Sequence, residues 1–489
     1  MEAGGAVAPA GHHGVRAYPG RLTMHMSFTC IVAAMGGLIF GYDIGITAGV
    51  TSMDPFLKFF RSAKERANGS STIKYCQLDS QVLALFTSLL YIAALSASLF
   101  ASTPTRLLGR RNSMMLGGVL FMAGAIGSGL AQDSWMLIIG RLLLGLGVGF
   151  ANHSVPLYLS EMAFHKLRGA FNASFQLFIT FGVLWANVLN LFTAKISGDW
   201  GWRLSLGGAV LPALIITLGA LVLPDTPSSM IERGQLADAR VLLQRIRGVC
   251  FEEVEEEEFN DLVSAALFAS SEANQDEWSI LLEKRYRPQL CLAIIIPFFQ
   301  QFTGINAIIF YAPLLFRSLG FGDHASIICA VITGVVNVVP TLVSVYSVDK
   351  WGRRALFLAG GALMLLCQAV IAASLGAELW DWLPNCPLGW LLPSEIFPLE
   401  IRSAAQSVSV SVNMAFTFAV AQIFSAMLCH LEFGVFVFFG FFVVVMSVFI
   451  YFFLPETKEI PLEEMSQIWT NHWYWSRFVT VAVADEVEE

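Results

Sequence analysis

Charged residues are scarce in this chain: Asp, Glu, Lys and Arg together make up 13% of its 489 residues. Apolar residues make up 56%, more than a soluble protein of this length could cover with polar surface. No basic stripe offsets the net charge of −8, which argues against nucleic acid as a partner. The eight cysteines form no C-x-x-C pair and the eight histidines no H-x-x-x-H pattern, so we expect no metal site. The composition indicates a multi-pass protein of the lipid bilayer.

Apolar stretches recur along the whole chain, and each is close to the length of about twenty residues that crosses the hydrocarbon layer. They predict six spans, a polar insert and six further spans. Most Lys and Arg fall in segments on the side of the N-terminus, so the positive-inside rule places both termini and the insert in the cytosol. The expected spans are 26–50, 79–101, 113–131, 135–158, 170–193, 202–223, 289–315, 324–348, 355–377, 380–397, 403–430 and 433–454.

The two halves of the sequence repeat each other. Similar strings follow the second, fourth and sixth spans of each half, which predicts two similar six-helix bundles with a binding site between them near the midplane. The paired strings are RLLGRR (106–111) and DKWGRR (349–354), SEMAFHKLRGA (160–170) and SEIFPLEIRSA (394–404), and LPDTP (223–227) and LPETK (454–458). The expected domains are a cytosolic N-terminus (1–25), a first bundle (26–223) with an external loop (51–78), a cytosolic helical linker (224–288), a second bundle (289–454) and a cytosolic tail (455–489).

Two ionisable residues fall inside predicted spans, where each would be costly alone in hydrocarbon. Asp43 belongs to the first span and Arg141 to the fourth. Both lie roughly 10 Å below the outer ends of their spans at the helical rise, so they are placed to form an ion pair. The residues alone leave two interpretations open: a static buried pair, or a proton site whose charge depends on the arrangement of the helices.

Neutral amides form the second group of polar residues near mid-depth. Each carboxamide both donates and accepts hydrogen bonds, which suits the vicinal hydroxyl groups of an uncharged polyol. The alternative is that they join helices to one another. Pro297, Gly304 and Pro313 bracket the string QQFTGIN and predict a break in the seventh span there. The amide residues are Gln176, Gln300, Gln301, Asn306, Asn337 and Asn413.

Four longer strings resemble the sugar porter family of the major facilitator superfamily, in particular the plant monosaccharide/proton symporters. The resemblance covers about residues 20–470. It implies an all-α membrane fold with 12 transmembrane helices in two six-helix bundles. It also implies no enzyme activity and no cofactor, with the proton as coupling ion, and alternating-access symport of a monosaccharide such as glucose across the plasma membrane. The strings are FGYDIGITAGVTSMDPF (40–56), GRLLLGLGVGFANHSVPLYLSEMA (140–163), QQFTGINAIIFYAP (300–313) and PLGWLLPSEIFPLEIRSAAQS (387–407).

The same resemblance implies roles for individual residues. Asp43 and Arg141 match the proton-coupling pair, and the six amides together with Phe40 and Trp390 match positions that line the sugar site. Cys76 and Cys429 match a disulfide between the external loop and the bundle, the alternative being two unrelated thiols. Charged residues in the cytosolic segments match an ionic latch, the alternative being topology signals alone. These latch residues are Arg110, Arg111, Glu161, Arg168, Arg353, Arg354, Glu395 and Arg402.

The tenth span departs from the family pattern. The second half has fewer residues between Arg354 and Ser394 than the first half has between Arg111 and Ser160, which predicts a shortened span. Its apolar part, 382–393, reaches only about 18 Å at the helical rise. An uncoupled hexose facilitator and a transport-incompetent shortened member or sugar sensor are therefore the alternative functions. The preferred sugar and the oligomeric state stay open.

Overall fold

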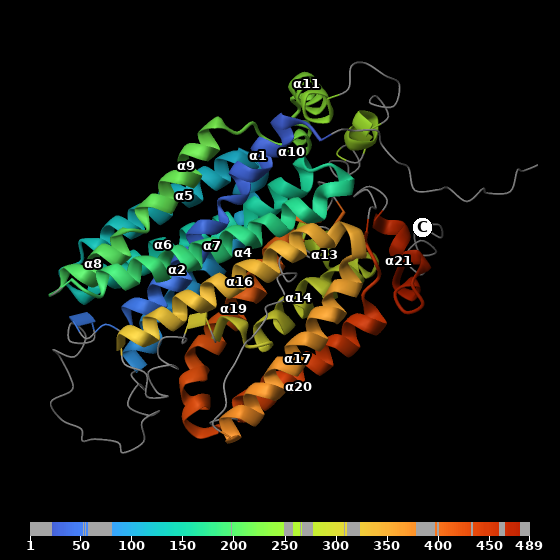
Figure 1. Ribbon diagram of the computed structural model, residues 1–489. Coiled ribbons are helices and arrows are strands. Elements are labelled where there is room, and N and C mark those ends of the chain that lie inside the picture. The colour runs from blue at the N-terminus through green and yellow to red at the C-terminus, as the bar shows by residue number, and fades with distance from the viewer. Residues whose placement is uncertain are drawn as a thin grey trace, which may run out of the picture.

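The molecule is helical throughout the part that the structure describes, and that part contains no strand (Figure 1). The structure is a computed structural model of the chain. Two groups of long helices lie side by side in it, one from each half of the sequence. The described residues are 22–51, 53, 55–56, 81–196, 198–248, 258–264, 266, 277–307, 309–310, 323–377, 397–398, 401–431, 434–458 and 465–479.

Helices of the first half follow the predicted spans within a few residues, except that the second and fourth continue further. The polar ends of these two helices extend the helical hydrogen bonding past the apolar stretch from which the spans were predicted. A turn at Met35 and Gly36 divides the first span into two helices. The helices are α1 (Met24–Ala34), α2 (Gly37–Val50), α4 (Gln81–Leu108), α5 (Arg110–Gly129), α6 (Ser134–Met162), α7 (Arg168–Thr193), α8 (Trp200–Gly207) and α9 (Val210–Val222).

The second half begins after a group of short helices and repeats the arrangement of the first. The break predicted in the seventh span is present: α14 ends at Phe302, and Gly304 takes a positive φ of 82°. The short helices are α10 (Pro227–Glu232), α11 (Leu236–Arg247) and α13 (Glu277–Leu281). The second-half helices are α14 (Arg287–Phe302), α16 (Asp323–Trp351), α17 (Arg353–Ala377), α19 (Arg402–Leu431), α20 (Gly434–Phe453) and α21 (Met465–Asn471).

Several predictions fall outside the described residues. The expected tenth span, with Trp390 and Glu395, lies there, and so does most of the external loop 51–78 with Cys76. Cys429 belongs to α19, but its side chain is outside the description, so the disulfide stays a prediction.

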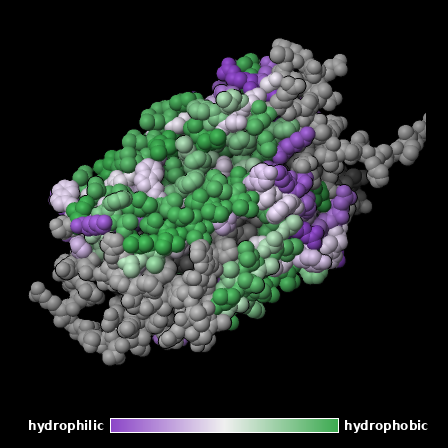
Figure 2. All heavy atoms as spheres, viewed as in Figure 1, coloured by the Kyte–Doolittle hydropathy of each residue, from purple (hydrophilic) through white to green (hydrophobic). Residues whose placement is uncertain are grey.

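The outer surface fits a lipid environment. In the part that the structure describes, nine helices or helix pairs are long and apolar enough to cross a membrane. Figure 2 shows apolar residues covering the sides of the long helices, whereas hydrophilic residues gather mainly near α11 and α21. A band of this kind matches the apolar surface that a protein presents to the hydrocarbon layer of a membrane.

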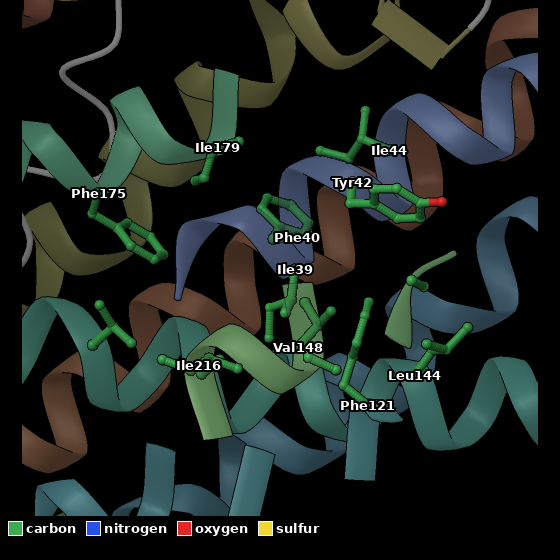
Figure 3. Packing of buried hydrophobic residues seen from close by; sticks show 14 of the residues in the cluster. Ile39, Phe40, Tyr42, Ile44, Phe121, Leu144, Val148, Phe175, Ile179 and Ile216 are labelled. Carbon is green, nitrogen blue, oxygen red and sulfur yellow. The ribbon is translucent and has the colours of Figure 1, made fainter. Parts of the chain in front are cut away.

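Buried hydrophobic residues form a separate cluster in each half, and the first cluster reaches across to the second half. Phe40 of α2 and Ile179 of α7 belong to the first cluster, in which Ile39 lies beside Val148 of α6 (Figure 3). Val410 and Met414 of α19 complete this cluster from the other half. The two halves therefore share packed apolar contact as well as polar contact.

Small residues let α2 and α7 approach closely. Gly37, Gly41 and Gly45 recur every fourth residue along one face of α2. A Cβ at Gly45 would lie 2.7 Å from the Val183 carbonyl oxygen, and one at Gly41 would collide with the Ile179 backbone. Helices in a bilayer often associate through such stripes, because small residues allow backbone contact over a wide area.

We expect Gly41→Ala to destabilise the protein by about 1–3 kcal/mol, because the added methyl group must displace the α7 backbone. The measurement is thermal unfolding of the purified protein in detergent. Gly127→Ala is the matched control, since a Cβ there would lie 4.0 Å from Gly140 Cα, its nearest neighbour outside the adjoining backbone of its own helix. Equal unfolding midpoints for the two variants would contradict the close contact between α2 and α7.

Candidate functional site

The predicted ion pair between the first and fourth spans is present. Arg141 Nη1 of α6 donates to Asp43 Oδ1 of α2 at 2.8 Å. The same nitrogen donates to the Thr47 hydroxyl at 2.9 Å, one turn further along α2. The Arg141 side chain is 0% exposed and that of Asp43 is 4% exposed. Two opposite charges are thus held together away from water, which strengthens their attraction.

Four of the six predicted amides form one hydrogen-bonded network between α14 and α19. Gln301 Nε2 donates to Asn413 Oδ1 at 3.1 Å, and Asn413 Nδ2 donates to Gln300 Oε1 at 2.8 Å. Asn306 Nδ2 donates to Gln301 Oε1 at 2.8 Å. These bonds fix the amide orientations on both sides of the break in the seventh span. Within the described residues, no hydrogen bond joins Gln176 or Asn337 to this network.

The other predicted sugar-site residues differ in their surroundings. Gln176 on α7 has a buried carbonyl oxygen that finds no hydrogen-bond partner among the described residues. Asn337 of α16 is buried. Phe40 packs in the apolar cluster of the first half (Figure 3). Gln176 thus keeps an acceptor available for a ligand hydroxyl group.

The carbonyl group at the break of the seventh span has a partner from another helix. Gln368 Nε2 of α17 donates to the Thr303 carbonyl oxygen at 2.9 Å. Gly304 lies against Phe439, so that a Cβ there would come 2.5 Å from the ring. A small cavity lined by Gln300 and Thr303 has room for about 30 Å³, which suits a water molecule and is too small for a monosaccharide.

One end of the molecule, which we name the arginine end, carries the loop arginines. In the first half, Arg110 Nη2 contacts Glu161 at 3.0 Å and its Nη1 contacts Glu232 of α10 at 2.6 Å. Arg168 is buried at the same end, at the start of α7. Glu161 also accepts a hydrogen bond from the Thr226 hydroxyl at 2.5 Å. Arg110 and Glu161, both among the predicted latch residues, are thus in contact within the first half, and their role as a latch stays a prediction.

The repeated strings make equivalent structures in both halves. Asp225 accepts hydrogen bonds from the backbone N–H groups of Arg110 and Arg111. Glu456 accepts from those of Arg353 and Arg354. Carboxylates at these helix N-termini satisfy free N–H groups and interact favourably with the helix dipole.

The guanidinium groups of Arg111 and Arg354 bind within their own halves, unlike the contacts between helix ends that an ionic latch implies. Their guanidinium groups donate to backbone carbonyls near the ends of α9 and α20: Arg111 to Ala220 and Leu221, and Arg354 to Tyr451. These carbonyl oxygens have no donor within their own helix. An arginine side chain can donate to them, whereas a carboxylate cannot. The two residues thus stabilise each half internally.

Contacts between the halves at the arginine end come from two acids. Glu161 of α6 lies 3.7 Å from Arg402 of α19. Asp349 of α16 accepts from the Ala170 backbone N–H at 2.8 Å and pairs with Arg353 at 2.9 Å. The sequence interpretation missed Asp349, although it lies within the repeated string DKWGRR and could have been found there.

His153 adds a further contact between the halves. Its Nε2 donates to the Ser403 carbonyl oxygen of α19 at 3.1 Å, and its Nδ1 accepts from the Thr105 hydroxyl of α4 at 3.3 Å. The ring is fully buried. A histidine at this position therefore joins α4, α6 and α19 close to the arginine end.

Comparisons with known proteins were consistent with one another. The chain matches the family model described as sugar (and other) transporter over residues 29–386 and 384–469. Sugar carrier protein C of Ricinus communis is 61% identical over 511 aligned residues, covering 98% of this chain and 96% of that protein. Sugar transport protein 1 of Arabidopsis thaliana is 60% identical, covering 98% of this chain and 96% of that protein.

Solved structures show the same fold. The major facilitator superfamily proton:xylose symporter XylE, bound to 6-bromo-6-deoxy-D-glucose, matches with a TM-score of 0.80 at 23% identity. The match covers 92% of this chain and 100% of that chain. An inward open conformation of XylE from E. coli gives 0.64 at 22% identity and covers 91% of this chain and all of that one.

The comparisons also bear on the shortened segment. The family match breaks at residues 384–386, within the expected tenth span. The alignment with the Ricinus protein runs over 511 residues, more than the 489 of this chain, so that protein has residues without a counterpart here.

We expect Glu161→Gln to loosen the arginine end, because two buried guanidinium groups lose their shared carboxylate. Modification of a cysteine introduced as S403C, followed by peptide mass spectrometry, should accelerate about tenfold or more. Arg402 loses the carboxylate that lies 3.7 Å away, and a buried ion pair that loses one partner costs about 3–5 kcal/mol. Glu232→Gln is the control, because Glu232 contacts Arg110 within the first half. Equal rates in both variants would show that Glu161 does not hold the halves together.

Proposed function

Because the chain belongs to the sugar transporter family, whose members are transporters and not enzymes, we propose that it carries a monosaccharide across the plasma membrane together with a proton. The observation that carries the coupled mechanism is the buried pair of Asp43 and Arg141. The names of the relatives support a sugar as substrate, and the description of XylE as a proton:xylose symporter supports a proton as coupling ion.

Proton uptake acts on one member of the pair. Arg141 keeps its charge at any physiological pH, so Asp43 is the group that exchanges the proton. A neutral Asp43 attracts the guanidinium less, and the contact between α2 and α6 weakens. Proton binding is then linked to a shift of α2, and the Thr47 hydroxyl keeps contact with Arg141 Nη1.

The amide network supplies the sugar site in this proposal. Gln301 and Asn413 present donors and acceptors in fixed directions, because each is already hydrogen-bonded to other amides. Gln176 adds a buried acceptor from the first half. A sugar bound between α7 and the α14/α19 network would contact both bundles, so its binding would favour their approach. Asn337, Phe40 and Trp390 complete the proposed set.

Alternating access follows from the contacts at the arginine end. We assign this end to the cytosol, with both termini and the linker 224–288 on that side, because most basic residues lie there. Glu161 with Arg402, and Asp349 with the backbone of Ala170, hold the two bundles together. These contacts must separate before the sugar leaves toward the cytosol, which gives them the role of a latch.

A transport-incompetent member is the second candidate function. The break of the family match at residues 384–386 favours it, because the tenth span of the two-bundle fold runs through this segment. Insertion of the corresponding residues of the Ricinus protein tests this candidate. Uptake that appears only after the insertion would select it over the symporter.

We expect the chain to accumulate radiolabelled glucose above the external concentration in transporter-deficient yeast, and a protonophore to abolish the accumulation. Asp43→Asn should leave at most equilibration, because the amide cannot exchange a proton. Asp133→Asn is the matched control, since Asp133 is exposed just before α6 and its side chain makes no capping bond. Accumulation by Asp43→Asn at the wild-type level would refute the coupling role. Equilibration of the unaltered chain, unaffected by protonophore, would identify an uncoupled facilitator.

For the sugar site, Gln301→Leu should raise the KM for glucose about tenfold or more, because two amide partners and the sugar each lose a hydrogen bond. Initial uptake rates over a range of sugar concentrations measure this. Gln289→Leu controls for loss of a buried amide elsewhere on α14. A similar KM in both variants would place the sugar away from the network.

A further inference from the structure

An aromatic ring covers the guanidinium group of the buried pair. The centroid of the Phe86 ring on α4 lies 4.0 Å from Arg141 Cζ. Phe86 is 3% exposed and Arg141 is 0% exposed, so water does not separate them. The face of an aromatic ring carries partial negative charge and attracts a cation placed over it. Phe86 is thus a second source of stabilisation for the Arg141 charge, from a third helix.

The other nitrogens of this guanidinium lack conventional acceptors. Asp43 and Thr47 both accept from Nη1. Arg141 Nε and Nη2 are buried and have no hydrogen-bond partner among the described residues. An unpartnered buried donor is costly, especially on a charged group. The ring face is therefore placed against a cation that hydrogen bonds satisfy only in part.

Neighbouring aromatic residues fix the position of the Phe86 ring. Its centroid lies 5.1 Å from that of Phe56, whose ring in turn lies 5.6 Å from Trp202 of α8. Phe56 and Trp202 are fully buried. A ring packed in this way cannot turn freely, so its face stays directed at the guanidinium group.

Proton uptake by Asp43 leaves Arg141 as a buried cation without its carboxylate, and this step rests on the proposed function. We propose that Phe86 is a positioning residue for proton uptake, whose ring face stabilises the Arg141 guanidinium while Asp43 is neutral. The ring lowers the free energy of the state with neutral Asp43. It also holds Arg141 in place, so that the ion pair can form again when Asp43 loses its proton. Phe86 itself exchanges no proton and contacts no sugar in this proposal.

Other titratable groups near the pair do not replace the ring. Tyr91 of α4 interacts electrostatically with Arg141, and Tyr42 of α2 with Asp43. The Tyr42 hydroxyl donates to the Ser205 carbonyl oxygen at 2.7 Å. Both are phenols, which stay neutral in the pH range of uptake. In the part of the chain that the structure describes, the charge balance of the site thus rests on Asp43 and Arg141.

The test weakens the ring face without changing its size. Phe86 is replaced by 3,4,5-trifluorophenylalanine through nonsense suppression in oocytes, and glucose-induced proton currents are recorded over a range of external pH. Fluorine withdraws negative potential from the ring face, so protonated Asp43 becomes less favourable and half-maximal current requires a more acidic solution. We expect a shift of about half a pH unit toward acid. Phe86→Leu should shift the profile in the same direction, and Phe86→Trp should retain the wild-type profile.

The control is the same fluorinated residue at Phe121, which is fully buried in the first-half cluster on α5. It should leave the pH profile unchanged. An unshifted profile for fluorinated Phe86, with normal current amplitude, overturns this inference and leaves the proposed symport intact. Absence of any glucose-induced proton current in the unaltered chain overturns the proposed function, and the inference with it.

Discussion

A charge inside a bilayer must be compensated, and the pair of Asp43 and Arg141 is where this chain meets that requirement. Ions lose most of their hydration in a low-dielectric interior, so each member of the pair is tolerable because of the other. The pair requires α2 and α6 to lie at matching depth and in contact. The glycine face of α2 brings α7 close on another side. The first-half bundle is thus organised around a buried ion pair, which the proposed function makes the site of proton binding.

Charges at the arginine end serve two purposes that the sequence does not distinguish. Asp225 and Glu456 accept from backbone N–H groups where α5 and α17 begin, and they stabilise each half separately. Glu161 and Asp349 instead connect the halves. A transporter of this fold needs both kinds of contact. In the proposed function each bundle stays rigid while the bundles move against each other, so that the internal contacts persist and the connecting contacts break.

Hydrogen bonding in the second half illustrates how a polar site is tolerated in a membrane helix. The break after Phe302 frees backbone groups that lipid could not satisfy, and Gln368 of α17 satisfies the Thr303 carbonyl. The amides on either side of the break bind one another in the described conformation. In the proposed function a bound sugar exchanges its hydroxyl groups for these amide partners.

The sequence by itself determined the fold class, the repeated two-bundle organisation and the depth of Asp43 and Arg141, because hydrophobic span length and residue spacing depend only on local composition. It also identified the charged residues of the cytosolic segments and the amide residues, each as a group. Only the tertiary structure decided that Arg111 and Arg354 bind helix-end carbonyls, that Asp349 reaches across to Ala170, and that Phe86 covers Arg141. These contacts join residues far apart in the chain. A neutral phenylalanine in an apolar helix has the same local pattern whether it faces lipid or a cation, so packing alone assigns its partner.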